Sequence, residues 1–362
     1  MKNFEIFIHS LVEKRVIPGI SLLVGKGEEI LLKKHYGYKS FLPQKEMLKE
    51  NTLYDLASLT KPLVTALLTL YLVEKETKIT LNTNIRKIFP QLAVDIDLVH
   101  LLTHTSGLPA WYPFYLYGED YIDQFKSLQL ESRPGKKVNY SCVGYILLYH
   151  IIETITGTSF NAFAQRVIFQ PLGLKNTFLS VPGNVKKMAA PTENGDQYEK
   201  KRAEKEHKNM ASHFTWRDYI LRGEPHDCNS WYLGGSAGNA GLFSTTEDIF
   251  RITREFFPST STILAPESTQ HFWKNLTPFK KSHRTIGFKC NSSFITSGGR
   301  ALSRKAIGHN GVTGTSFWLE PGNGYTFILL TNRVHPVMVD EKKVSFNRIR
   351  RKLHRMIVKE LK

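Results

Sequence analysis

The spacing of apolar residues predicts that the chain begins with a helix followed by a β-hairpin. In residues 3–16 the apolar side chains recur every three or four positions, and Pro18 and Gly19 end this pattern. Two short predicted strands, residues 20–24 and 30–35, lie on either side of the turn sequence Gly-Lys-Gly-Glu at 25–28. Short strands around such a turn are typical of a hairpin. We therefore expect one helix and then two antiparallel strands in the first 35 residues.

The middle of the chain is mainly helical in its pattern. A long apolar run predicts a helix that opens near Ser58 and ends near Lys75. Further helices are expected over residues 81–89, 96–103, 143–154 and 160–169. Residues 183–230 are polar and irregular, and the mixed charges at 199–208 indicate a solvated face or a loop. The aromatic residues that crowd positions 111–121 are expected either to line a substrate pocket or to pack beneath a long loop.

From residue 284 the pattern changes to short strands, over residues 285–289, 305–308, 315–319 and 325–331, and residues 342–361 again have helical spacing. Strands at both ends with helices between them predict an α+β fold. The terminal segments would share one antiparallel sheet with flanking terminal helices. We expect a single unit over residues 1–362, in which 1–57 and 235–362 form the sheet-containing region. Residues 58–234 would form an inserted, mainly helical region with a charged insertion near 195–212.

Composition adds a marked excess of positive charge to this picture. Of the 362 residues 41% are hydrophobic, while 49 Lys and Arg against 32 Asp and Glu give a formal net charge of +17. Such a charge attracts nucleic acid, anionic lipid or acidic substrates, but no nucleic-acid-binding motif accompanies it. We therefore expect no specific nucleic-acid partner. The last helix could contact an anionic membrane peripherally through its basic side (Arg348, Arg351, Lys352, Arg355 and Lys359).

The cysteines and the N-terminus limit the remaining classes of protein. Cys142, Cys228 and Cys290 are widely spaced and predict neither a disulfide framework nor a zinc site, so no metal or organic cofactor is expected. The first residues contain no unbroken apolar core and no cleavage site of small residues, and we see no transmembrane span. A cytoplasmic location is the expectation, or a periplasmic or membrane-associated one if a leader has been removed.

The most specific chemistry lies at the start of the Ser58 helix. Ser58 and Lys61 are three residues apart, so a helix places them on one face about one turn from each other. A hydroxyl, an amine and free backbone N–H groups would then meet at one point, where the helix dipole favours negative charge. This pattern predicts a serine activated without a histidine, although such a pair taken alone is more often a helix cap and a solvated lysine.

Two later motifs support a catalytic interpretation of Ser58 and Lys61. Tyr140, Ser141 and Cys142 precede another predicted helix, and His309, Asn310 and Gly311 lie on or beside a late strand. In this order the motifs resemble those of the penicillin-recognising serine hydrolases, namely class C β-lactamases, D-alanyl-D-alanine peptidases and related esterases. Further stretches that resemble the family lie at residues 101–108, 171–174, 238–245 and 330–333, so the resemblance spans most of the chain.

The resemblance implies a cleft between an α/β region and a helical region, and it implies roles for single residues. Ser58 would be the nucleophile that forms an acyl-enzyme, and Lys61 and Tyr140 would relay protons. The backbone N–H groups of Ser58 and Val312 would form the oxyanion hole. Which member of the Lys61–Tyr140 pair is the base stays open, because their titrations are coupled.

Two departures from the β-lactamase pattern bear on the substrate. Cys142 stands where the family usually has Asn, and His309 stands where β-lactamases usually have Lys. A thiol is a weak hydrogen-bonding group, and histidine is mostly neutral at pH 7. Both changes weaken recognition of an anionic β-lactam or of a peptide C-terminus, which favours an esterase or amidase-like hydrolase over a dedicated β-lactamase. Cys142, His309, Asn310 and Gly311 are expected to bind a small-molecule or peptide-like ester or amide.

Three readings of function follow. The first is a serine hydrolase of the esterase or peptidase type, and the second is a β-lactamase or a D-alanyl-D-alanine carboxypeptidase. The third is a relative that has lost catalysis and serves in binding or assembly, which the intact set of Ser58, Lys61 and Tyr140 disfavours.

Overall fold

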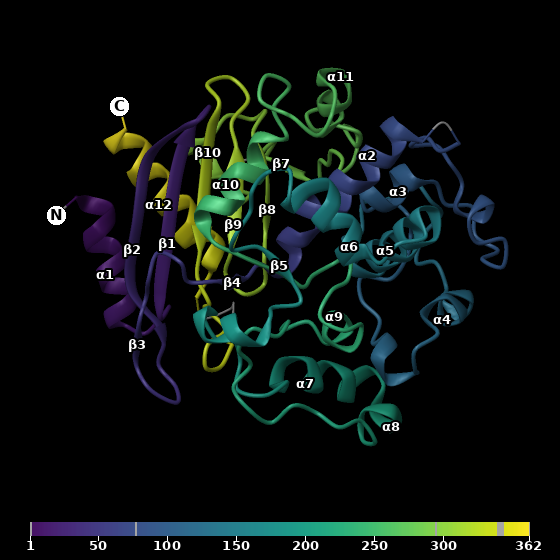
Figure 1. Cartoon of the computed structure of the whole chain (residues 1–362), viewed down its shortest axis with the longest axis horizontal. Helices are drawn as coiled ribbons and strands as arrows, with labels where there is room; N and C mark the ends of the chain where they lie inside the picture. Colours follow the sequence, from purple (N-terminus) through teal and green to yellow (C-terminus); the bar gives the residue numbers. More distant parts are fainter. Residues whose placement is uncertain (1, 77, 294, 339–343, 362) are drawn as a thin grey trace.

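The two ends of the chain build one seven-stranded antiparallel sheet, as predicted. The computed structural model describes residues 2–76, 78–293, 295–338 and 344–361. Within them the strand order is β3-β2-β1-β10-β9-β8-β7 (Figure 1), so the N-terminal hairpin pairs directly with the last strand. The strands are β1 (Gly19–Lys26), β2 (Glu29–Ser40), β3 (Glu46–Met47), β7 (Lys289–Cys290), β8 (Ile307–Asn310), β9 (Ser316–Leu319) and β10 (Tyr325–Leu330).

Both faces of this sheet are covered, because side chains alternate between the faces of a strand. In β10, Phe327 and Leu329 belong to a cluster with α1 (Asn3–Glu13) and α12 (Phe346–Glu360), whereas Ile328 and Leu330 join the larger core. Figure 1 shows α1 and α12 at the outer side of the sheet, with both chain ends beside them. The apolar side of the last helix thus packs on the sheet, and its basic side remains outside.

A mainly helical region lies on the other side of the sheet (Figure 1). Its helices and those beside it are α2 (Leu67–Lys75), α3 (Leu98–Leu102), α4 (Tyr121–Ser127), α5 (Cys142–Thr156), α6 (Phe160–Ala164), α9 (Cys228–Tyr232), α10 (Thr246–Arg254) and α11 (Pro266–Thr269). A small sheet, ordered β4-β6-β5, links the two regions through β4 (Tyr54–Asp55), β5 (Phe178–Leu179) and β6 (Leu242–Ser244). The α+β class is confirmed, while the region boundaries at 57/58 and 234/235 stay predictions.

The helix expected from Ser58 forms, but its first turns are irregular. A tight turn, Ala57–Leu59, leads into wide turns over Lys61–Ala66 before α2 begins. Pro62 contributes to this irregularity because it has no backbone N–H to donate. The whole segment Ala57–Lys75 is long and apolar enough to cross a membrane, but 78% of its most apolar stretch is buried inside the protein. Its apolar character therefore fits a core helix.

Other predicted elements are shorter than expected. The helix over 81–89 is reduced to one tight turn, Ile85–Lys87. The strand over 285–289 is wrong except for its last residue, because Thr285 donates its N–H to the Phe288 carbonyl in a turn with Gly287 at φ +78°. Residues 342 and 343 of the last predicted helix lie outside the described residues. Further tight turns cover Phe114–Leu116, Gly183–Met188, Gln270–Phe272 and Gly299–Ala301.

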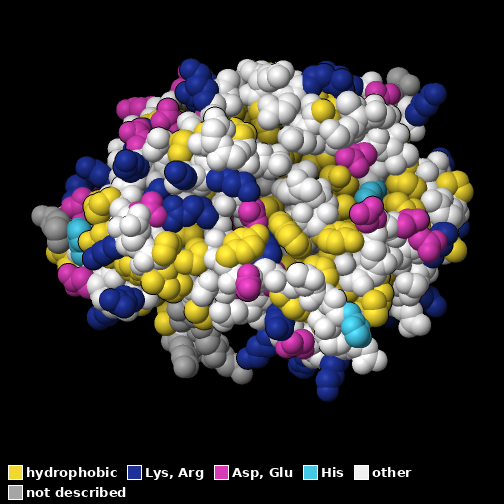
Figure 2. All heavy atoms as spheres, turned by 60° about the horizontal axis from the view of Figure 1, so that its bottom comes forward, with side chains coloured by type: hydrophobic (Ala, Val, Ile, Leu, Met, Phe, Trp, Pro, Cys, Tyr) yellow, Lys and Arg dark blue, Asp and Glu magenta, His cyan; other side chains and the backbone are white. Residues whose placement is uncertain are grey.

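The mixed-charge segment is helical, which corrects the expectation of an irregular stretch. It forms α7 (Gln197–Glu206) and α8 (Lys208–Ala211). On the face that carries them, basic and acidic side chains are interspersed around a band of hydrophobic ones (Figure 2). Ala203 and Ala211 pack with Trp111 and Tyr115, and Glu199 is buried and accepts a hydrogen bond from Trp111 Nε1 at 2.9 Å. Trp111 and Tyr115 therefore pack beneath α7 and α8.

Candidate active site

Ser58 sits on a turn that is fixed by neighbouring elements. Its side chain is half-buried, whereas Ala57 before it is buried and adopts φ +46°, an uncommon conformation for alanine. Asp55, at the end of β4, holds this backbone: one carboxylate oxygen accepts from Ala57 N and the other from His226 N, both at 2.8 Å. The backbone just before Ser58 is thus held in place by a buried carboxylate.

Lys61 lies directly against this serine, as the three-residue spacing predicts. Its side chain is 0% exposed. Its Nζ donates to Ser58 Oγ at 3.2 Å, to the Asn239 carbonyl at 2.8 Å and to Cys142 Sγ at 3.4 Å. Asn239 is itself held by Asp227, whose Oδ2 accepts from Asn239 Nδ2 at 3.0 Å. Sequence reasoning did not find this Asp227–Asn239 link, whose position depends on the tertiary fold.

Tyr140, two residues before the start of α5, completes the group. Its ring centroid lies 5.1 Å from Lys61 Nζ and 4.4 Å from the ring of His104. Burial raises the pKa of Tyr140, and the Lys61 charge only partly offsets this. Burial opposes the charge on Lys61, yet Cys142 and Tyr140 raise its pKa above the ordinary value. Near neutral pH the resting pair is therefore an ammonium ion beside a neutral phenol.

Two backbone N–H groups are available at the same place. In the described part of the chain, no carbonyl accepts from the N–H of Ser58 or Val312. The turn that carries Val312 is tied to the segment before Ser58 by two threonines. Thr313 Oγ1 donates to the Asp55 carbonyl at 2.8 Å, and Thr315 Oγ1 donates to the Leu56 carbonyl at 3.1 Å. These bonds fix the turn of Val312 relative to the serine.

These residues open into one cleft between the sheet and the helical region. The cavity has a volume of about 310 Å³. It is lined by Ser58, Tyr140, Arg284, Lys289, Gly308, His309, Asn310, Gly311, Val312, Trp318, Arg333, Asn347 and Arg350. The structure thus brings together the motifs at 58–61, 140–142 and 309–312, which lie far apart in the sequence.

Comparison with known proteins identifies the family. A model of the family described as Beta-lactamase matches residues 4–348. The chain belongs to the Beta-lactamase family. A protein of Salmonella agona (strain SL483), provisionally named D-alanyl-D-alanine carboxypeptidase, is 30% identical over 361 residues, covering 90% of this chain and 81% of the relative. A relative of the same name from Escherichia coli (strain K12) is 29% identical with the same coverage.

Solved structures show the same fold. A class C β-lactamase from Rhodobacter sphaeroides superposes with a TM-score of 0.74 at 19% identity, and the match covers 99% of both chains. The predicted family and the predicted fold class are both confirmed. This Beta-lactamase family member is accordingly an enzyme of the serine-hydrolase type. In its described residues, no group of three or more His, Cys, Asp and Glu side chains could hold a metal ion.

His309 is neutral in this family member. Its Nδ1 donates to the Asn310 carbonyl at 3.0 Å, and its Nε2 is buried without a hydrogen-bond partner in the described residues. Burial and the charges of Lys61 and Arg284 hold its pKa well below the ordinary value. At the position where β-lactamases usually carry Lys, this enzyme therefore presents an uncharged ring.

Four basic residues line the cleft instead, Arg284, Lys289, Arg333 and Arg350, and sequence reasoning assigned none of them to the site. Arg284 and Lys289 line the cavity, and within the described residues neither has a carboxylate at ion-pair distance. Burial lowers the pKa of both, and for Lys289 the charge of Arg284 lowers it further. The Arg284 guanidinium carbon is 5.5 Å from the ring centroid of Tyr140. No motif marks either residue, because only the turn at Gly287 brings them to the serine.

Cys142 contacts Lys61, whereas its position in the motif suggests a contact with substrate. It is also absent from the lining of the cavity. His309, Asn310 and Gly311 do line the cavity. The binding roles of all four residues, and the catalytic roles of Ser58, Lys61 and Tyr140, stay predictions.

Proposed function

We propose that this enzyme hydrolyses an amide or ester whose substrate carries a free carboxylate near the bond that is cleaved, as in peptides that end in D-alanyl-D-alanine. The observation that carries this proposal is the pair of unpaired cations, Arg284 and Lys289, in the Ser58 cleft. A buried guanidinium without an acidic partner has a large gain from binding a carboxylate, because such charge-assisted bonds are strong. The provisional names of the two relatives support the same substrate class.

In the proposed mechanism, Ser58 is the nucleophile and forms an acyl-enzyme. One proton must first leave the Lys61–Tyr140 pair, since both groups are protonated at rest. The pair then takes the proton of the Ser58 hydroxyl as Oγ attacks the carbonyl carbon. The carbonyl electrons move onto oxygen, which the N–H groups of Ser58 and Val312 stabilise.

Breakdown of this intermediate completes the cycle. The bond to the leaving amine or alcohol breaks as the pair returns the proton to it, and Ser58 remains esterified. Water then attacks the acyl carbonyl and gives its proton to the same pair. The proton finally returns to Ser58 as the acid product leaves.

A neutral ester is the second candidate substrate. The uncharged His309, together with Cys142 in place of the usual Asn, removes two groups that would bind an anionic β-lactam in the usual way. This favours the esterase reading over a dedicated β-lactamase. One structural neighbour at a TM-score of 0.70 is described as EstCE1, a hydrolase with promiscuous acyltransferase activity, but at 17% identity it speaks only for the fold.

The deciding experiment compares three substrates: a peptide ending in D-alanyl-D-alanine, the same peptide with an amidated C-terminus, and a neutral p-nitrophenyl ester. Ser58→Ala should abolish turnover of all three. Arg284→Gln should lower kcat/KM for the free peptide by roughly 10- to 100-fold, as expected for the loss of a charged hydrogen bond. It should change hydrolysis of the neutral ester little.

Two results would refute parts of this proposal separately. Full activity of Ser58→Ala would remove the acyl-enzyme mechanism. Equal use of the free and amidated peptides would remove the carboxylate requirement while leaving the mechanism in place. If no substrate is turned over and a serine-reactive probe leaves Ser58 unlabelled, the non-catalytic reading is supported instead.

A further inference from the structure

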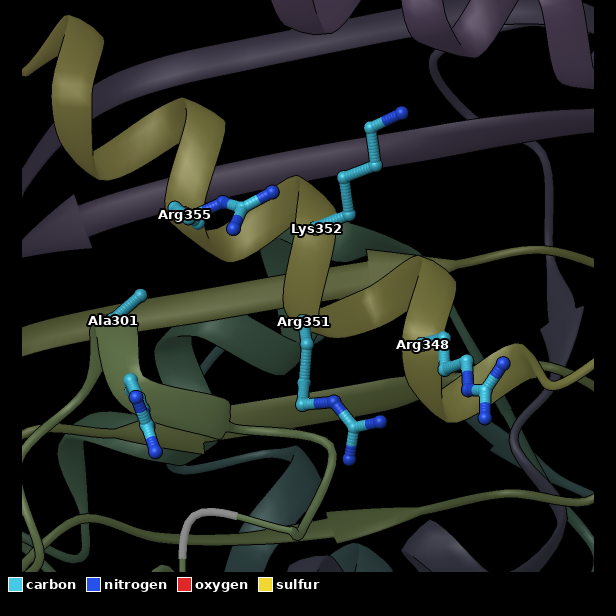
Figure 3. A pocket seen from close by; sticks show the side chains of 6 residues that line it. Ala301, Arg348, Arg351, Lys352 and Arg355 are labelled. Carbon is cyan, nitrogen blue, oxygen red and sulfur yellow. The ribbon is translucent and has the colours of Figure 1, made fainter.

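A second cavity is lined by other residues than the Ser58 cleft, and these are almost all basic. It has a volume of about 380 Å³ and lies between α12 and the turn Gly299–Ala301. Its lining consists of Arg300, Ala301, Arg348, Arg351, Lys352 and Arg355, which we call the basic pocket. In Figure 3, Arg348 and Arg351 project from α12 to one side, whereas Lys352 points to the other.

The charges of the basic pocket are not compensated by acids. Within the described residues, none of its five cations forms an ion pair with a carboxylate. Arg351 Nη1 instead donates to the Ile295 carbonyl at 2.7 Å, and Lys352 Nζ lies 3.9 Å from the ring centroid of Phe7. The face in Figure 2 differs, because acidic side chains are interspersed among its basic ones.

The packing of α12 explains why these cations face solvent. Its apolar residues are held in the cluster between α12, α1 and the sheet (Phe346, Ile349, Leu353 and Ile357). Arg348, Arg351 and Arg355 recur at three and four positions, so they share the opposite side of the helix. With a rise of about 1.5 Å per residue, they form a stripe roughly 10 Å long. The stripe is rigid because the sheet anchors its helix.

An exposed apolar side chain adjoins this stripe. Ile295 is 77% exposed, and its carbonyl is the acceptor for Arg351. A rigid cluster of arginines beside an exposed isoleucine is complementary to a surface in which a layer of phosphate groups covers a hydrocarbon layer. Arginine binds phosphate through two parallel N–H bonds, and clusters of basic residues bind anionic headgroups.

We propose that the basic pocket and Ile295 form a docking surface for an anionic lipid bilayer. The arginines bind headgroup phosphates, and Ile295 enters the boundary between headgroups and acyl chains. The first turn of the same helix also reaches the cleft of Ser58, because Asn347 and Arg350 line that cavity. Docking would thus hold the cleft beside the membrane. This proposal stands independently of the hydrolytic one.

The test is sedimentation of the full chain with vesicles of phosphatidylcholine alone and of phosphatidylcholine mixed with phosphatidylglycerol. The triple variant Arg300→Gln/Arg348→Gln/Arg355→Gln changes three exposed residues of the basic pocket. It should lower partitioning onto the anionic vesicles on the order of 100-fold, since each basic residue near such a surface contributes about fivefold. Binding by the wild type should also weaken as salt is raised.

A matched control removes the same charge elsewhere. Lys201→Gln/Lys205→Gln/Lys208→Gln changes three exposed lysines in and beside α7 and should retain most of the vesicle binding. Circular dichroism and hydrolysis of the neutral ester establish that both triple variants fold. Equal loss in the two variants would overturn the proposal, because binding would then follow net charge alone.

Two further arms identify the ligand. Ile295→Ser should weaken binding to anionic vesicles, but it should leave any competition by inorganic phosphate unchanged. Failure of the wild type to prefer anionic vesicles over phosphatidylcholine would refute the proposal. Binding to a short DNA duplex with no binding to vesicles would also refute it and would assign the basic pocket to nucleic acid.

Discussion

Glu199 provides a quantitative test of how the mixed-charge segment is folded. Its side chain is buried under the aromatic residues, where it accepts from Trp111 Nε1. Burial, reinforced by the charge of Asp227, raises the pKa of Glu199 from 4.5 to about 7. The unfolded chain has the ordinary value, so between these two pH values only the folded state retains the proton. Folding is therefore linked to proton binding at this residue.

The size of the effect follows from that difference in pKa. A rise from 4.5 to about 7, at 1.36 kcal/mol per pKa unit, corresponds to roughly 3 kcal/mol. This stabilisation is fully present below pH 4.5 and is lost as the pH rises through about 7. Glutamine at this position keeps an oxygen acceptor for Trp111 but cannot ionise. Glu199→Gln should therefore gain stability relative to wild type as the pH rises, approaching roughly 3 kcal/mol above the folded-state pKa.

Urea denaturation of both proteins across this pH range measures the difference directly, because other titrating groups cancel in the comparison. Glu204→Gln is the matched control, since Glu204 lies on the same helix but is exposed. Its stability should follow that of wild type at every pH. A constant difference between Glu199→Gln and wild type from low to high pH would refute the buried, protonated glutamate.

Two further predictions concern catalysis. Lys61 and Tyr140 both have raised pKa values, and the pair must lose a proton before it can act as a base. We therefore expect kcat/KM to rise with pH through the alkaline range. A profile that falls above neutrality would contradict the conclusion that both groups are protonated at rest. Gly311→Ala should lower kcat by more than tenfold with a smaller change in KM. The reason is that a Cβ at this position would clash with the Leu56 carbonyl, two residues before Ser58. Unchanged kinetics would show that the turn at Gly311 and the turn before Ser58 are not rigidly coupled.

The sequence predicted the architecture and the central residues for identifiable reasons. Alternating and helical spacings of apolar residues gave the antiparallel sheet from both chain ends, and the spacing of Ser58 and Lys61 gave their hydrogen bond. Tyr140 and His309 reach the same cleft because their motifs open a helix and occupy a strand that the fold brings together.

The elements that escaped prediction depend on tertiary contacts. Arg284 acquires its position from a turn that needs positive φ at Gly287, where the sequence pattern resembles an ordinary strand. The helix α7 carries so few apolar residues that its buried side is marked only by Glu199 and Ala203. Its partners, Trp111 and Tyr115, lie about 85 residues earlier. Local patterns cannot indicate such a pairing.

The pairing of β1 with β10 also sets the order in which the protein can mature on the ribosome. These strands are separated by roughly 300 residues, which takes on the order of 15–60 s to synthesise. During that interval β1, seven of whose eight residues are buried in the finished fold, has only the hairpin strand β2 as a partner. The turn that carries Val312 is also synthesised long after Ser58, so the cleft at Ser58 can assemble only once that turn has been made. Hydrolytic activity should therefore appear abruptly during synthesis. Until β10 and the turn of Val312 have been made, we expect the long N-terminal portion to bind chaperones.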